Sequence, residues 1–175
     1  MSNTGAVAAS ATQIGNLLDQ LAVVIERLDD VEYRVVRARE VSGSIGGHVR
    51  HCLDHVRALV SGLPSCRIGY DVRARDTEIE RQRGAAAREA RRLAESLAAV
   101  RDLAVDLELD VEVRIDPKSD RCLVVRSTLA RELAFVASHT VHHFAIVALL
   151  LRDMGIGVPP RFGYAPSTPS PELAA

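Results

Sequence analysis

The sequence has no tryptophan, and aromatic residues make up only 3% of its 175 positions. This scarcity argues against the aromatic platforms on which single-stranded nucleic acids stack. The sequence also has no basic excess, because 22 Lys and Arg stand against 23 Asp and Glu and give a net charge of −1. General DNA or RNA binding needs such an excess. We therefore expect no nucleic-acid partner.

Long hydrophobic runs are absent as well. No apolar stretch reaches the 18 residues that would suggest a membrane span, and no basic residue followed by an apolar stretch opens the chain as in a secretory signal. The cysteines Cys52, Cys66 and Cys122 are odd in number and form no CxxC pair. These features predict a soluble protein of a reducing cytoplasm with no membrane partner.

The length and the apolar fraction of 47% are those of one ordinary globular domain. A chain of this size buries about 70% of the surface of its unfolded form, so its core needs no disulfide or metal. We expect residues 1–175 to form a single domain. The proline-rich segment from about 156 to 175 is predicted to be an extended tail.

Apolar residues recur at helical spacing in four stretches of the chain. The first covers about 9–30, after a start at 1–8 that is small, polar and expected to fray. The second begins at the N-cap residue Ser44 and ends at Gly62. These two stretches predict two amphipathic helices.

A third helix is predicted from Thr77, where the pattern Thr-Glu-Ile-Glu resembles a capping box, to about Leu103. Gly84 lies inside this stretch, but it costs only about 1 kcal/mol relative to alanine and is not expected to break the helix. Ser127 or Thr128 then caps a last helix, which is apolar on most faces and is predicted to be the most buried.

Between the third and the last helix the apolar period changes from the helical one to two. Residues 107–115 alternate between apolar and charged, a turn containing Pro117 follows, and 121–126 return as RCLVVR. This pattern predicts a β-hairpin over about 107–126. The expected fold is therefore mainly α, with four helices and one small hairpin before the last helix.

All six histidines fall on two of the predicted helices: His48, His51 and His55 on the second, and His139, His142 and His143 on the last. The first three lie within about 60° of one another around a helix. The i and i+4 pair formed by His139 and His143 shares one face, with Cβ atoms about 6 Å apart. Two such imidazoles joined by a third from a facing helix make a metal site with three nitrogen ligands.

Solvated or mutually hydrogen-bonded histidines are the alternative to a metal site. Each unsatisfied polar group in a bundle core costs about 1–3 kcal/mol, which favours the metal interpretation for two facing clusters. A zincin motif is excluded because Thr140 stands where its glutamate would be, and no GxSxG elbow exists. Cys52 is a candidate fourth ligand or thiol partner, although a small buried helix residue is the favoured interpretation.

Four segments of the chain form a recognisable set, namely SIGGHVRHCLDH (44–55), YDVRARDTEIE (70–80), RELAFVASHTVHHFAIVALL (131–150) and FGYAPST (162–168). In combination they resemble the DinB-like (damage-inducible) superfamily of bacterial metalloproteins. The resemblance spans most of the chain from the second helix onward. It implies an antiparallel four-helix bundle, often a homodimer, with a histidine triad that commonly holds zinc or nickel.

By the register of this resemblance, His51 is the ligand from the second helix, and His139 and His143 are the pair from the last. His48 lies one turn before His51 and is an alternative to it. His142 is expected beside the site rather than in it, and His55 is expected to support the ligands.

The resemblance also implies a class of activity, since family members with assigned roles include thiol-dependent S-transferases and isomerases. A three-histidine metal keeps one coordination position open for a water or a thiol. We therefore expect a metal-dependent transferase or hydrolase that acts on a small molecule, with a low-molecular-weight thiol as cofactor. The alternative is a metal-binding or stress-associated bundle protein without turnover. No residue is identified as general base.

The connection before the third helix supplies candidate substrate ligands, namely Tyr70, Arg73 and Arg75. An arginine here can hold an anionic substrate through its planar fork. The alternative is that Asp71 and Asp76 pair with these arginines and fix the loop.

Overall fold

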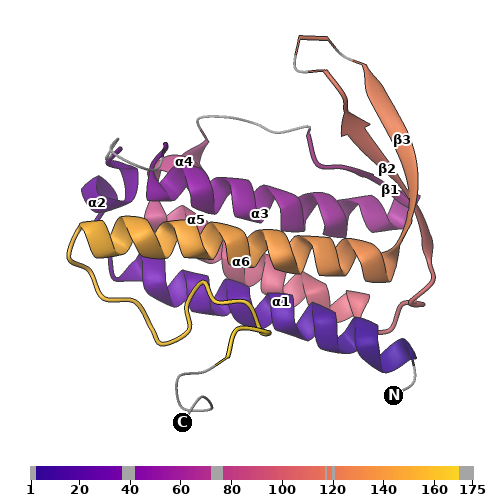
Figure 1. Ribbon diagram of the computed structural model, residues 1–175, viewed down its shortest axis with the longest axis horizontal. Helices are drawn as coiled ribbons and strands as arrows, with labels where there is room; N and C mark the ends of the chain where they lie inside the picture. Colours follow the sequence, from indigo (N-terminus) through magenta and orange to yellow (C-terminus); the bar gives the residue numbers. More distant parts are fainter. Residues whose placement is uncertain (1–2, 37–41, 72–76, 117, 120, 170–175) are drawn as a thin grey trace.

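The computed structural model describes residues 3–36, 42–71, 77–116, 118, 119 and 121–169. Four long helices lie side by side, and a small sheet projects from one end of them (Figure 1). The long helices are α1 (Asn3–Glu26), α3 (Ile45–Gly62), α5 (Arg83–Ser96) and α6 (Leu129–Asp153). The shorter elements are α2 (Asp30–Arg34), η1 (Leu63–Ser65), β1 (Arg67–Gly69), α4 (Glu78–Arg81), η2 (Leu97–Val100), β2 (Glu108–Arg114) and β3 (Cys122–Thr128). The predicted mainly α fold is confirmed.

Each long helix packs against two others, with α1 and α3 both contacting α5 and α6. Helices α3 and α6 run in opposite directions, since His48 lies beside His143 while His55 lies beside Phe135. In contrast, α3 and α5 run in the same direction, as do α1 and α6 (Figure 1). The antiparallel arrangement implied by the resemblance is therefore present in α3 with α6 and in α1 with α5, but not at every contact.

The first helix begins earlier than the sequence suggested. Residues 1–8 were expected to fray, yet α1 starts at Asn3, and Val7 and Ala11 are buried in the core. Burial of these small apolar side chains accounts for the extra turns, since most helical stability in proteins comes from packing. At the other end α1 stops at Glu26 rather than at 30. The Asp29 carboxylate caps the separate helix α2 through a complete capping box.

The third predicted helix is two helices rather than one. Thr77 has the backbone of an N-cap, but its side chain makes no capping hydrogen bond, so the predicted capping box is not formed. The helix breaks at Gln82, whose φ of −125° and ψ of 109° are extended. Its neighbour Arg83 donates its backbone N–H to the Asp30 carboxylate, 3.1 Å away. A contact with α2 thus replaces helical hydrogen bonding at the break.

The two helices that carry the histidines begin where the sequence predicts. The Ser44 hydroxyl accepts the backbone N–H of Gly47 at 3.0 Å and caps α3. The Thr128 hydroxyl accepts the backbone N–H of Arg131 at 3.4 Å and caps α6. These caps satisfy donors that a helix start otherwise leaves unpaired, and they set the register of both helices.

The sheet has the order β1-β2-β3. Strands β2 and β3 pair antiparallel, with Val113 opposite Leu123, and they occupy the two stretches predicted as strands. Strand β1 pairs parallel to β2, with Ile68 opposite Val111. A three-residue strand has too few positions to show an alternating pattern, which is why it was not predicted. Its end places the following residue, Tyr70, beside the bundle.

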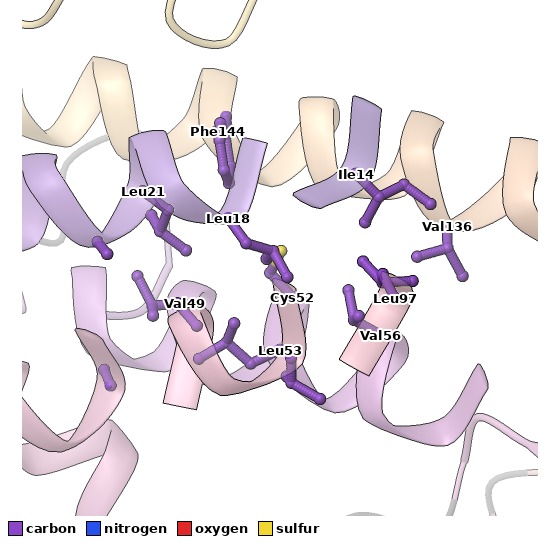
Figure 2. Close-up of a cluster of buried hydrophobic side chains, with 14 of the residues drawn as sticks. Ile14, Leu18, Leu21, Val49, Cys52, Leu53, Val56, Leu97, Val136 and Phe144 are labelled. Atoms are coloured by element: carbon purple, nitrogen blue, oxygen red, sulfur yellow. The ribbon is translucent and has the colours of Figure 1, made fainter. Parts of the chain in front are cut away.

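The core lies between the four long helices and contains Ile14, Leu18, Leu53, Val136 and Phe144 (Figure 2). Among the described residues, α6 is the helix long and apolar enough to span a membrane by length and composition. A core helix passes the same test, and α6 packs against α1 and α3. Leu149 on α6 is 54% exposed, so the helix is less buried than its apolar faces predicted.

The described part of the tail has neither helix nor strand, as predicted, and it folds back onto α6. Phe162 is buried and its ring stacks on that of Phe144, with centroids 4.7 Å apart and an interplanar angle of 18°. Gly163 follows with a φ of +80° and lies so close to the backbone of Ala145 that a Cβ would clash. The tail is therefore extended but anchored.

Two neighbouring glycines of α3 provide a test of this packing. A Cβ on Gly46 would clash with the Glu80 carbonyl oxygen and lie 2.9 Å from Cε1 of Tyr33, whereas a Cβ on Gly47 meets nothing closer than 3.5 Å. We expect Gly46→Ala to lower the free energy of unfolding by about 1–3 kcal/mol through overpacking. The matched control Gly47→Ala should change it by less than about 1 kcal/mol. Urea unfolding measures both, and equal stabilities would contradict this account of the α3–α4 contact.

Candidate metal centre

Three histidines from two helices converge in the bundle. His51 of α3 meets His139 and His143 of α6, and one ring nitrogen from each lies within 4.8 Å of the other two. The Nε2 atoms of His51 and His139 are 3.1 Å apart. His51 and His139 are half-buried and His143 is buried, so the group lies near the surface rather than in the centre of the core. We call these residues the histidine trio.

Antiparallel packing of α3 on α6 places the trio. A spacing of four puts His139 and His143 on one face of α6, and α3 presents His51 to that face. Beneath the rings, the buried Cys52 thiol donates a hydrogen bond to the Thr140 hydroxyl, 3.6 Å away. Both residues are almost fully buried, so this contact joins the two helices inside the core.

The trio fits a metal ion in donor type, and one pair of its nitrogens has the spacing of two metal ligands. Histidine nitrogens lie about 2.0–2.1 Å from zinc, which puts two ligands of a tetrahedral ion about 3.3 Å apart. The observed 3.1 Å between His51 and His139 is close to that value. Burial and the neighbouring imidazoles, His139 first among them, lower the pKa of His143 to about 3. The ring is therefore neutral near pH 7, which is the form that binds a metal.

His48 lies beside the trio but outside it. Its Nδ1 is 3.2 Å from Nδ1 of His143, and its Nε2 is 3.1 Å from the carbonyl oxygen of Ser42. The sequence left His48 and His51 as alternative ligands from α3. The geometry places His51, and not His48, in the group with His139 and His143.

The two remaining histidines flank the trio, in line with the prediction. His55 is buried, its Nδ1 lies 2.9 Å from the His51 carbonyl oxygen, and its ring centroid is 3.9 Å from that of His139. A carbonyl oxygen only accepts, so Nδ1 of His55 is the donor. His142 is exposed, with its ring 6.5 Å from that of His139.

Cys52 matches the favoured interpretation of a small buried residue. Burial raises the pKa of its thiol to about 12. A neutral thiol is a poor metal ligand, because the thiolate is the binding form. Its hydrogen bond to Thr140 also directs it between the helices.

Tyr70 and Glu132 form a buried polar contact next to the histidines. The Tyr70 hydroxyl donates to the Glu132 carboxylate at 2.8 Å, and its ring stacks on that of His55 at 5.3 Å. Glu132 is fully buried and also accepts from the Ser127 hydroxyl at 2.5 Å and from Arg131 at 2.8 Å. Burial and this carboxylate raise the pKa of Tyr70 far above its usual value, so the phenol stays a donor.

This contact changes the expectation for Tyr70. A hydroxyl that reaches a pocket mouth was predicted, but the structure directs it to a buried carboxylate. Arg73 and Arg75, the other predicted substrate ligands, lie outside the described residues. Glu132 was not among the predicted site residues, although an acid on the apolar last helix, two turns before His139, was the available indication.

Two tyrosine variants test how much this contact contributes to the stability of the fold. Tyr70→Phe removes a hydrogen bond to a buried carboxylate, and bonds to charged groups contribute about 1.5–3 kcal/mol. We expect the free energy of unfolding to fall by that amount. Tyr164→Phe is the control, since Tyr164 is 48% exposed and should change stability by less than about 0.5 kcal/mol. Chemical denaturation of both variants checks this, and a neutral Tyr70→Phe would refute it.

Comparison with known sequences gives a partial match. No family model matches the chain. A protein named FK506-binding protein 5 from Rhizopus delemar is 29% identical over 101 residues. The match covers 58% of this chain and 26% of that protein, so the chain spans about a quarter of that relative's length.

Comparison with solved structures gives a likeness over nearly the whole fold. A DinB-like protein from Bacillus subtilis superimposes with a TM-score of 0.53, over 87% of this chain and 95% of that one, at 17% sequence identity. The likeness extends beyond the histidine-bearing helices to the arrangement of the elements around them. The chain has the DinB-like fold.

Proposed function

We propose that this protein is a metal-dependent enzyme that holds one divalent transition-metal ion with His51, His139 and His143. The observation that carries the proposal is the convergence of three ring nitrogens, from two facing helices, to within 4.8 Å of one another. Neutral imidazoles suit zinc and nickel, the two metals that the DinB-like resemblance favours. The likeness in fold supports the same assignment.

With three protein ligands, a four-coordinate ion keeps one position at which a water or a thiol binds and loses its proton more readily. The half-buried His51 and His139 leave that side of the trio within reach of solvent. Phe135 lies 5.7 Å from His139 between ring centroids and 5.1 Å from Tyr70, and it forms an apolar wall beside the ligands. A small electrophile that reacts with a low-molecular-weight thiol suits such a site.

The reaction class we propose is group transfer or hydrolysis on a small molecule. The tightly held Tyr70–Glu132 pair supports His55, which in turn packs against His139. These residues orient the ligand rings rather than contact the substrate. Arg73 and Arg75 remain the predicted ligands for an anionic substrate.

A second candidate function is a metal-binding protein without turnover. It is favoured by the density of imidazoles, since His48 contacts His143 and His55 contacts His139 on either side of the trio. A site closed by further ligands would hold metal firmly and bind no substrate. The two candidates differ in whether a coordination position is open.

Metal content tests the site itself. Protein purified without a histidine tag should contain, or take up from zinc or nickel, about one ion per chain. His139→Ala combined with His143→Ala should lose that ion, because two of the three ligands are gone. Elemental analysis by mass spectrometry after dialysis gives the stoichiometry.

The exposed His142 supplies the matched control for the metal experiment. His142→Ala removes an imidazole from the same helix and should retain about one ion per chain. A wild-type protein that takes up neither metal would refute the proposal, and so would a double variant that keeps its ion.

A thiol titration separates the two candidates. In protein reconstituted with cobalt(II), added glutathione or cysteine should produce a saturable thiolate-to-cobalt charge-transfer band, because a site with three protein ligands has a position for the thiol. An unchanged visible spectrum at saturating thiol would instead support the closed, non-catalytic site. Azide serves as a second small anionic ligand in the same assay.

A further inference from the structure

His48 connects a backbone carbonyl to a member of the histidine trio. Its Nε2 faces the carbonyl oxygen of Ser42 at 3.1 Å, and its Nδ1 faces Nδ1 of His143 at 3.2 Å. The ring is half-buried, and its plane is tilted 38° from that of His143. Both of its nitrogens therefore have a partner at hydrogen-bond distance.

The Ser42 carbonyl determines where the protons lie in this chain of contacts. A carbonyl oxygen only accepts, so Nε2 of His48 must carry the proton. With that proton on Nε2, a neutral His48 ring has its lone pair on Nδ1. The short contact between the two Nδ1 atoms needs one proton, and that proton must then belong to His143. Nε2 of His143 is left with its lone pair.

We propose that His48 is a positioning residue that accepts the Nδ1–H of His143 and so holds His143 in the tautomer whose Nε2 is free to bind a metal. The effect on metal binding rests on the proposed metal site, but the tautomer of His143 is set without metal. A partner that fixes the tautomer of a metal-binding histidine typically changes metal affinity by 10- to 100-fold.

The backbone before α3 has a conformation that directs the Ser42 carbonyl toward the His48 ring. Gly43 follows Ser42 with a φ of +103°, a conformation that side chains rarely adopt, and a Cβ on it would lie 3.3 Å from Nε2 of His48. Ser44 then caps α3 and sets the position of His48 one turn further on. The sequence Ser-Gly-Ser thus brings the carbonyl to the His48 ring.

A ligand role for His48 is disfavoured by the same contacts. His48 lies outside the group whose ligand atoms are within 4.8 Å of one another. Its lone pair is already engaged by His143. His48 therefore acts on the metal through His143.

Long-range ¹H–¹⁵N correlation spectra of the metal-free protein near pH 7.5 test the proposal directly. We expect His143 as the Nδ1–H tautomer in the wild type. In His48→Ala it should shift toward the Nε2–H form that free histidine prefers. His48→Asn should restore the Nδ1–H form, because its amide oxygen replaces the lone pair of Nδ1. His142→Ala is the control: its ring lies 5.2 Å from that of His143, so the variant can move the shifts of His143 but should leave its tautomer unchanged.

Cobalt(II) affinity, measured by competition with a chelator, is the second readout. His48→Ala should weaken binding 10- to 100-fold and His48→Asn should recover most of the loss. Wild-type affinity in His48→Ala, or an Nε2–H tautomer of His143 in the wild type, would overturn the proposal. If the wild type binds no metal but shows the expected tautomers, the metal site fails while the assignment of His48 stands.

Discussion

The packing of α3 against α6 is the constraint on which the rest of the structure depends. The two helices run in opposite directions, and the buried Cys52 thiol on α3 contacts the Thr140 hydroxyl on α6. The residues that precede these two, His51 and His139, meet with their Nε2 atoms 3.1 Å apart. Any rotation of one helix about its own axis would separate His51 from His139 and His143.

Each neutral imidazole offers one donor and one acceptor, so the nitrogen that carries the proton must be determined for every ring of the site. Backbone carbonyls determine it for two of the rings here. The carbonyl of Ser42 fixes the tautomer of His48, and the carbonyl of His51 fixes that of His55. Because a carbonyl never donates, the tautomers of His48 and His55 are determined without any metal. These two rings in turn limit the tautomers that the neighbouring trio can adopt.

The sheet supports the same site from the end of the bundle. Strand β1 brings Tyr70 beside His55, and the Tyr70 hydroxyl is held by Glu132 on α6. A fully buried carboxylate is costly unless its oxygens are paired, and Glu132 has three donors. This polar contact connects the residue after β1, the start of α6 and the histidines.

Local sequence rules predicted the two helices that carry the site, and they predicted that the histidines of one helix face those of the other. The caps at Ser44 and Thr128 and the i, i+4 spacing of His139 and His143 are local features, so they are visible in the sequence. The break at Gln82 was not predictable in this way, because it depends on the contact of the next residue, Arg83, with Asp30, which is 53 positions away in the chain.

Contacts between distant residues also account for what was missed at the site. Glu132 pairs with Tyr70 across 62 positions, and periodicity holds no information on such a pair. The role of His48 likewise depends on the distance of its ring from His143, 95 positions away. Spacing showed which residues share a helix face, but not whether His48 or His51 would join His139 and His143 in one group.

The central claim is that one ion lies between His51, His139 and His143. Anomalous diffraction from crystals of the zinc-loaded protein, recorded on both sides of the zinc edge, tests it most directly. The account predicts a single peak with one nitrogen of each of these three residues about 2.0–2.1 Å away and a non-protein ligand in the remaining position. A peak coordinated by His48 or Cys52 in place of one of the three, or no peak near these helices, would contradict it.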